Sequence, residues 1–300
     1  YRNFGTKLWN ACSFAEFNQA FDKRSDSLPN PELALNKWIV GEVGRVRVAV
    51  DTALTNYRFN DSASALYTFI WGSVCDRYLE LSKPVLKGEH SSGQAGRSET
   101  QTTLAWVLEQ SMVLLHPIMP FITEELWGLT AQRDKMLVHQ NWPAYGLDLI
   151  DDTATNEISW TIALIDAIRS ARAQMNVPAG AKVPLVQVSN NISGSSALAA
   201  NIVQIKQMAR ITEVTKAEKM PKGAITVSAP GATFGLPLAN IIDVAAEKAR
   251  LEKNLGKLAK ELGGLRGRIK NPKFATSAPA EVLAETQANL TAREEEEEKI

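Results

Sequence analysis

Apolar residues recur three and four positions apart over much of the chain, a spacing typical of helices that bury one face. One run keeps this spacing through five steps and comprises Ile39, Val43, Val46, Val50, Ala53 and Tyr57. The alternation of Val46, Val48 and Val50 would also suit a strand, but the helical run is longer than a typical strand. We therefore predict a helix across this segment.

Polar residues and prolines mark helix boundaries within residues 1–150. Asn60 and Asp61 suit the start of a helix, because their side-chain oxygens can accept hydrogen bonds from its free backbone N–H groups. Pro117 ends a helical pattern, and Pro120 stands where a first-turn proline opens the next helix. Six of the seven tryptophans lie in this region, which predicts a helical bundle that holds the largest core.

The pattern changes over residues 151–243, where short strand-like runs appear. These runs cover residues 183–189, 211–216, 224–228 and 233–238. A helical run around residues 198–208 separates the first two. Strands and helices mixed in so short a stretch predict a small α+β domain.

Residues 244–300 carry a leucine repeat. Its members alternate four and three positions apart and are Leu251, Leu255, Leu258, Leu262, Leu265 and Ile269. This heptad spacing is typical of a coiled coil. Asn271 and Pro272 would stop the helix, and Pro279 would open a second, less regular one. We predict an antiparallel helical hairpin, which makes the fold class mainly α: a helical bundle, a small α+β domain and a C-terminal hairpin.

Composition narrows the class of protein. Hydrophobic residues make up 45% of the chain and charged residues 22%, and no apolar run approaches the roughly 20 residues that cross a membrane. Cys12 and Cys75 form no disulfide framework or metal cluster, so we expect a cytoplasmic protein without a zinc site. The chain opens at Tyr1 without a start Met, from which we expect a fragment of a longer protein.

The net charge is zero, but the two signs are separated along the sequence. Residues 244–273 hold nine cations and three acids, a local charge of +6, whereas residues 281–298 hold seven acids and one cation, a charge of −6. A positive helix suits RNA phosphates, although its cations could instead be solvated or paired with acids of the other arm. The candidate RNA contacts are Lys248, Arg250, Lys253, Lys257, Lys260, Arg266, Arg268, Lys270 and Lys273.

The first predicted helix has an apolar face and a polar stripe about 90° away. The apolar face holds Phe4, Leu8, Ala11 and Ala15, and the stripe holds Asn3, Lys7, Asn10 and Phe14. An aromatic ring beside amides and a cation suits stacking on an unpaired base. The alternative is that Phe14, like Phe17 and Phe21, packs beneath the next helix.

Several segments resemble the class I aminoacyl-tRNA synthetases. HPIMPFITEELW at residues 116–127 is similar to a block of the anticodon-binding bundle in the enzymes for valine, isoleucine and leucine. RNFGTKLWNA at residues 2–11 resembles the first helix of that bundle. Three further segments narrow the resemblance to one of these enzymes. They are IRSARAQMNVPAGAKVPL at residues 168–185, LPLANIID at residues 236–243, and the leucine repeat running to NPKFATSAPAEVL. In this order they resemble the C-terminal region of bacterial valyl-tRNA synthetases.

The resemblance implies that valine tRNA is the partner. The bundle would bind the anticodon loop through Arg2, Asn3, Lys7, Asn10 and Phe14, and the hairpin would bind the tRNA elbow. The family has an Arg immediately before the stacking aromatic, where this chain has Ser13. Arg169 and Arg172 are further candidates for contact with RNA.

The resemblance also implies that the intact enzyme uses ATP with magnesium in the cytoplasm, as a monomer with no membrane or DNA partner. The HIGH and KMSKS motifs are absent, so we expect no catalytic residue, metal or cofactor site in this chain. Two alternatives stay open. One is the same module of isoleucyl-tRNA synthetase, although its cysteine-rich zinc segment is missing; the other is a coiled-coil adaptor between proteins.

Overall fold

The computed structural model describes residues 2–238, 244–270 and 280–299, with the side chains of 244–254, 280–281, 284 and 295–299 outside that description. The chain divides into two compact units. One comprises Tyr1–Arg172 and Gly180–Pro237, and the other comprises Ala173–Ala179 and Leu238–Ile300. The predicted boundaries at residues 150 and 243 stay a prediction.

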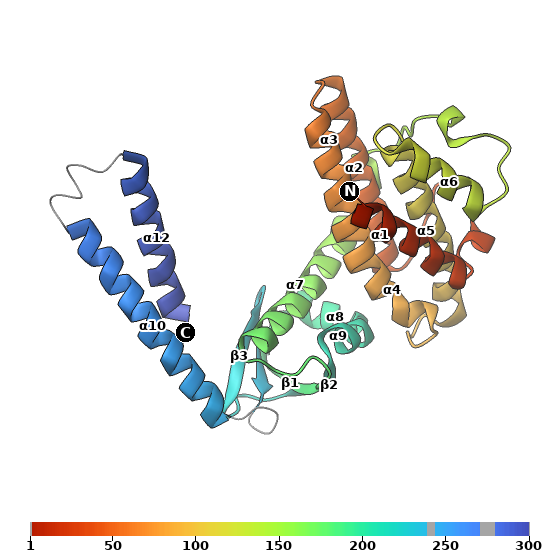
Figure 1. Ribbon diagram of the computed structural model, residues 1–300. Coiled ribbons are helices and arrows are strands. Elements are labelled where there is room, and N and C mark those ends of the chain that lie inside the picture. Colours follow the sequence, from red (N-terminus) through yellow and green to blue (C-terminus); the bar gives the residue numbers. More distant parts are fainter. Residues whose placement is uncertain (1, 239–243, 271–279, 300) are drawn as a thin grey trace. The chain divides into compact units, whose positions relative to one another are not determined.

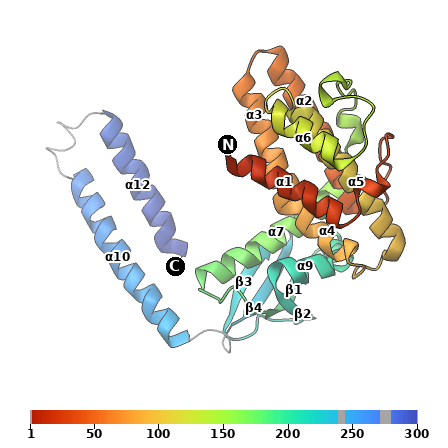
Figure 2. The same cartoon turned by 45° about the vertical axis from the view of Figure 1, so that its right-hand side comes forward.

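Helices form the first part of the chain (Figure 1). They are α1 (Arg2–Phe17), α2 (Ala34–Thr55), α3 (Phe59–Tyr67), α4 (Leu79–Leu86), α5 (Gly93–Leu115) and α6 (Pro120–Thr130). A π-helical segment, η2 (Thr68–Tyr78), joins α3 to α4 without a break, so these three elements form one continuous rod. Figure 2 shows α1 crossing the other helices of the bundle.

The predicted helical face of α2 is confirmed, with one exception. Ile39, Val43 and Val50 are fully buried, and the valine alternation does not form a strand. Tyr57 is 81% exposed and has a φ of 57°, because α2 ends at Thr55 and the chain turns there. The last residue of the apolar run, Tyr57, therefore lies beyond the end of the helix.

The predicted start of the next helix is wrong. α3 begins at Phe59 with Arg58 at the N-cap position, so Asn60 and Asp61 lie within its first turn. Asp61 pairs there with Arg58 at 2.6 Å, a contact that suits an acid near a helix N-terminus. The proline predictions hold, because α5 ends at Leu115 and Pro120 opens α6.

A buried polar cluster joins three elements of the bundle. Asn36 of α2 is fully buried and donates to Glu99 Oε1 at 2.8 Å and to Thr100 Oγ1 at 3.0 Å, both on α5. The Tyr78 hydroxyl of η2 donates to Asn36 Oδ1 at 2.8 Å. Burial raises the pKa of Tyr78 well above its usual value, so the hydroxyl stays a donor. The cluster fixes the register of η2 against α2 and α5.

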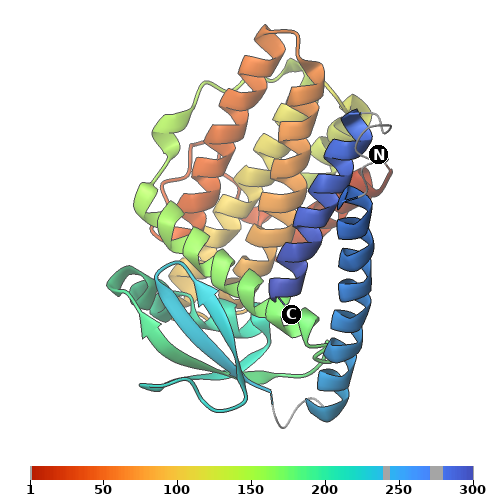
Figure 3. The same cartoon turned by 90° about the vertical axis from the view of Figure 1, so that its left-hand side faces the viewer.

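The predicted small α+β region is confirmed. α7 (Asp152–Gln174) precedes a four-stranded sheet of order β2-β1-β4-β3, in which only β1 and β2 are parallel. The strands are β1 (Val183–Asn190), β2 (Ile211–Lys216), β3 (Ala224–Ala229) and β4 (Ala232–Pro237). The single helix expected between the first two is a pair, α8 (Ile192–Ala200) and α9 (Ile202–Ala209). Figure 3 shows these helices and α7 behind the sheet, on one of its faces.

The C-terminal segment is a pair of helices, α10 (Val244–Lys270) and α12 (Ala280–Lys299), that run side by side (Figures 1 and 3). Leu258 and Leu262 pack with Leu290, and Leu265 and Ile269 border this small core. The predicted heptad seam is therefore confirmed from Leu258 to Ile269, whereas Leu255 is half-buried and lies outside this core. Asn271, Pro272 and Pro279 lie outside the described residues. The mainly α fold class, with its bundle, small α+β region and hairpin, is confirmed.

Candidate nucleic-acid interface

The two predicted faces of α1 are separated in the structure. Its apolar face is buried, and this face comprises Phe4, Leu8, Ala11 and Ala15. Arg2, Asn3 and Asn10 are exposed, while Lys7 and Phe14 are half-buried. Three of the five candidate residues on α1 are thus open to a partner, and the other two are held against the neighbouring rod.

Lys7 is held in place by η2. Its Nζ lies 2.9 Å from Asp76 Oδ1 and 4.8 Å from the centroid of the Trp71 ring. The hydrogen bond to Asp76 raises the pKa of Lys7, so the ammonium group stays charged. A cation over an indole ring presents a fixed positive charge at the edge of the α1 stripe.

Phe14 lies beside Lys83 of α4, whose Nζ is 6.0 Å from the ring centroid. Lys83 is itself held by Glu80 at 2.5 Å. The expectation that Phe17 packs like Phe21 is wrong, because Phe17 is 87% exposed at the end of α1 whereas Phe21 is buried. A partly open ring, a cation and a second open ring therefore lie along this end of α1.

An aromatic stack next to α1 was missed from the sequence. The rings of Phe4 and Tyr67 stack at 5.2 Å, and those of Tyr67 and Trp71 stack at 5.6 Å. Tyr67 is 50% exposed, so the stack reaches the surface. The i, i+4 spacing of Tyr67 and Trp71 is the signal that could have placed them together. Their contact with Phe4 is long-range and has no local signal.

Some cations of the hairpin form ion pairs with acids, and others are exposed without an ion pair. Arg266 Nη2 binds Glu294 Oε1 at 2.8 Å, and Arg293 Nε lies 3.5 Å from Glu261 Oε2, so both pairs link the two arms. This pairing is the alternative role expected for the cations of this arm. Among the residues with described side chains, Lys257, Lys260 and Lys270 are exposed and form no ion pair.

The remaining candidates on the hairpin are only partly described. Arg268 is exposed. The side chains of Lys248, Arg250, Lys253 and Lys273 lie outside the described residues. By heptad position, Lys260 lies opposite the leucine seam, whereas Arg266 flanks it. The open cations of the described part therefore lie away from the face that holds the arms together.

Arg169 and Arg172 serve the fold. Arg169 Nε donates to the carbonyl oxygen of Met208 at 3.0 Å, and Arg172 Nη2 donates to that of Ala181 at 2.7 Å. Arg172 is only 7% exposed, and burial lowers the pKa of its guanidinium. Both side chains tie α7 to the backbone around the sheet; Arg172 is buried there, whereas Arg169 stays exposed.

Metal-binding residues do not gather in the described part of the chain. It contains no group of three His, Cys, Asp or Glu side chains able to hold a metal ion. Cys12 and Cys75 are free and buried, and burial raises the pKa of Cys12 to about 12 and that of Cys75 to about 11. No helix among the described residues is long and apolar enough to span a bilayer.

Comparison with known families identifies two segments of the chain. Residues 36–187 match the family described as the anticodon-binding domain of tRNA ligase. The chain therefore belongs to the anticodon-binding domain family of tRNA ligases. Residues 243–300 match the family described as the valyl tRNA synthetase tRNA binding arm, which places the chain with the C-terminal region of valyl-tRNA synthetases.

Curated relatives agree with these matches. The chain is 58% identical over 308 residues to a valine–tRNA ligase of Ruegeria pomeroyi and 52% identical over 302 residues to one of Cereibacter sphaeroides, in both cases along its whole length. It is 44% identical over 288 residues to a valine–tRNA ligase of Agrobacterium fabrum, with 95% of the chain covered. The chain spans 30% of the length of each of these relatives.

Proposed function

We propose that this chain is the tRNA-binding part of a valine–tRNA ligase and binds valine tRNA at two places. The bundle contacts the anticodon loop, and the hairpin contacts the elbow of the tRNA. The observation that carries this proposal is the match of one segment to an anticodon-binding domain and of another to a tRNA-binding arm. The intact ligase would join valine to tRNA with ATP and magnesium, through residues outside this chain.

On the bundle, the exposed stripe of α1 would bind unpaired bases. Phe14 supplies a partly open ring for stacking, which contributes about 1–3 kcal/mol per base. Asn3 and Asn10 are exposed amides that can pair with base edges, and Arg2 and Lys7 can bind phosphate. The neighbouring Lys83 and the exposed Phe17 extend the same surface.

On the hairpin, the open cations would bind the sugar–phosphate backbone. Lys257, Lys260 and Lys270 are exposed and unpaired within the described side chains, so contact with phosphate breaks no ion pair. Each phosphate contact releases a counterion and makes the affinity depend on salt. Arg266 is already bound to Glu294 and would contribute less. The chain would act in the cytoplasm as a monomer that positions its tRNA.

Binding of the purified chain to valine tRNA, at two salt concentrations, tests this function. The controls are isoleucine tRNA and a valine tRNA with a substituted anticodon. We expect preference for valine tRNA, loss of that preference when the anticodon is changed, and weaker binding in high salt. An equally strong preference in the opposite direction, for isoleucine tRNA over valine tRNA, would favour the isoleucyl module. Absence of RNA binding together with micromolar self-association would favour the coiled-coil adaptor and overturn the proposal.

A further inference from the structure

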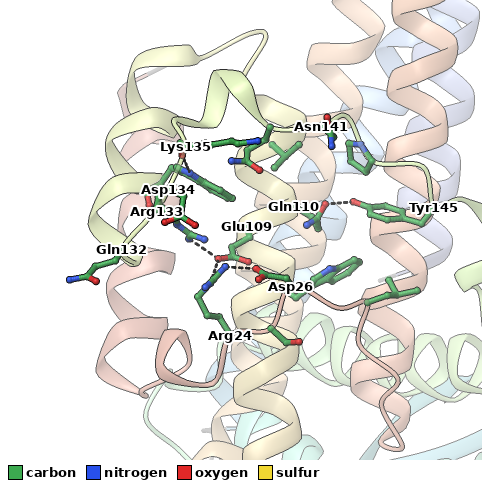
Figure 4. Close-up of a pocket in the computed structure, with 17 residues that line it drawn as sticks. Arg24, Asp26, Glu109, Gln110, Gln132, Arg133, Asp134, Lys135, Asn141 and Tyr145 are labelled. Carbon is green, nitrogen blue, oxygen red and sulfur yellow. Dashed lines mark hydrogen bonds and ion pairs between the residues drawn. The ribbon is translucent and has the colours of Figure 1, made fainter.

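A polar pocket lies on the bundle against α5, between α5 and side chains drawn from the segments 24–28 and 132–145 (Figure 4). Its volume is about 640 Å³, within the range of small-molecule sites. The pocket shares no residue with the proposed anticodon-loop set. Its wall is ordered by the Tyr145 hydroxyl, which donates to Gln110 Oε1 at 2.7 Å. The pocket is therefore a separate feature of the bundle.

The floor of the pocket holds two guanidinium groups. Glu109 Oε1 lies 2.6 Å from Arg133 Nη2 and 3.2 Å from Arg24 Nε, so two guanidinium groups share one carboxylate (Figure 4). The side chains of Glu109 and Arg133 are 6% and 7% exposed. Asp26, which is 89% exposed, also pairs with Arg24, and the exposed Asp134 lines the pocket as well. The pocket lining is therefore balanced in formal charge, with Glu109 and Arg133 as its buried charged groups.

Arg133 is fixed in orientation and has an unused donor. Its Nε donates to the carbonyl oxygen of Trp127 at 3.1 Å, and its guanidinium lies 3.8 Å from the centroid of the Trp127 ring. Its Nη1 is buried and has no hydrogen-bond partner. A buried N–H group without an acceptor is unfavourable, so a bound acceptor would stabilise this arrangement.

We propose that this pocket binds an oxyanion, a phosphate or carboxylate group, through Arg133. An oxyanion supplies the acceptor that Nη1 lacks, and a charge-assisted hydrogen bond to a guanidinium is stronger than a neutral one. Lys135 lines the rim, is exposed and forms no ion pair, so it can bind the outer oxygens. The oxyanion comes either from a free small molecule or from the backbone of the bound tRNA.

Calorimetric titration of the whole chain with inorganic phosphate and with acetate, at constant ionic strength, tests this site. We expect saturable binding of at least one anion. Arg133→Lys keeps the charge but removes the planar donor pair, and we expect it to weaken binding about tenfold. Because Arg133→Lys disturbs a buried ion pair, Lys135→Gln provides a rim variant that leaves the floor intact and should weaken binding severalfold.

Lys222→Gln is the matched control, since Lys222 is exposed on the β2–β3 connection and does not line the pocket. Its phosphate affinity should equal that of the unsubstituted chain. Saturating tRNA separates the two sources: loss of anion binding assigns the site to an RNA phosphate, and retention assigns it to a free anion. No saturable binding of either anion, or equal weakening by Lys135→Gln and Lys222→Gln, would overturn the proposal.

Discussion

The ammonium group of Lys7 lies 2.9 Å from the carboxylate of Asp76, so a candidate RNA-binding cation is tied to an acid of the neighbouring rod. The side chains are 34% and 45% exposed, which leaves the pair accessible to solvent. Asp76 thus holds Lys7 in place and also lowers the net positive charge beside the α1 stripe.

We predict that Asp76→Asn strengthens tRNA binding by a few fold and makes it depend more steeply on salt, because one negative charge near the phosphates is removed. Lys7→Gln should weaken binding. Affinities from filter binding at two salt concentrations measure both effects. Weaker binding after Asp76→Asn would mean that the orientation of Lys7 matters more than the local charge.

The open rings at the end of α1 give a second prediction. Phe14→Ala should reduce affinity for valine tRNA about tenfold through loss of base stacking, and Phe17→Ala should reduce it by a smaller factor. Phe121→Ala is the control, because Phe121 is 90% exposed but lies on α6. Fluorescence titration measures the affinities. Equal effects of all three substitutions would contradict a specific stacking surface on α1.

Some cations of the hairpin are ion-paired with acids and others are not, so we predict that they contribute unequally to tRNA binding. Lys260→Gln should lower the slope of log affinity against log salt by about one unit, as for one lost phosphate contact. Arg266→Gln should change that slope less, because Arg266 is bound to Glu294. Glu294→Gln frees Arg266 and should steepen the slope. A series of binding constants from low to high salt distinguishes the three variants.

Stability should fall in alkaline solution because of the buried thiols. The pKa of Cys12 rises from 9.0 to about 12 on folding, so between these values the unfolded chain loses this proton first. The contribution of the neutral thiol is thus complete below pH 9 and declines as the pH rises towards 12. Urea unfolding at pH 8 and pH 10 checks the trend, and Cys12→Ala should make stability less dependent on pH.

The polar cluster around Asn36 gives a stability prediction. Asn36→Ala leaves the buried Tyr78 hydroxyl without its acceptor and should lower the free energy of unfolding by about 2 kcal/mol. Asn10→Ala, at an exposed position of α1, should change it by less than about 0.5 kcal/mol. Chemical denaturation of both variants measures the difference. An unchanged midpoint for Asn36→Ala would show that water replaces the lost partner.

Local patterns predict the elements of this fold well. The buried face of α2, the proline at the start of α6 and the leucine seam of the hairpin all depend on neighbours within a few positions. The cap assigned to Asn60 failed because Arg58 occupies the N-cap position, two residues before Asn60. Side-chain propensity indicates that a helix begins nearby but does not fix the first residue.

The sequence does not indicate which residues far apart along the chain contact each other. Lys7 and Asp76 are 69 positions apart, and Arg24 and Glu109 are 85 positions apart. Their pairing depends on how the helices cross, which periodicity does not specify. The same holds for Phe4 and Tyr67, whose stacking brings an unpredicted aromatic surface beside the predicted stripe. The anticodon-loop and elbow residues therefore remain predictions, although the exposure of those with described side chains is now defined.

The π-helical segment η2 determines which sequence changes the surface around the α1 stripe can tolerate. Trp71 and Asp76, which hold Lys7, both lie within its wide turns. Loss of a single residue upstream of them would rotate their side chains around the rod by the angle that one residue contributes, away from α1. Insertions and deletions in this segment would thus be far more damaging than substitutions. The winding of one helix, as much as its side chains, sets what α1 can offer to RNA.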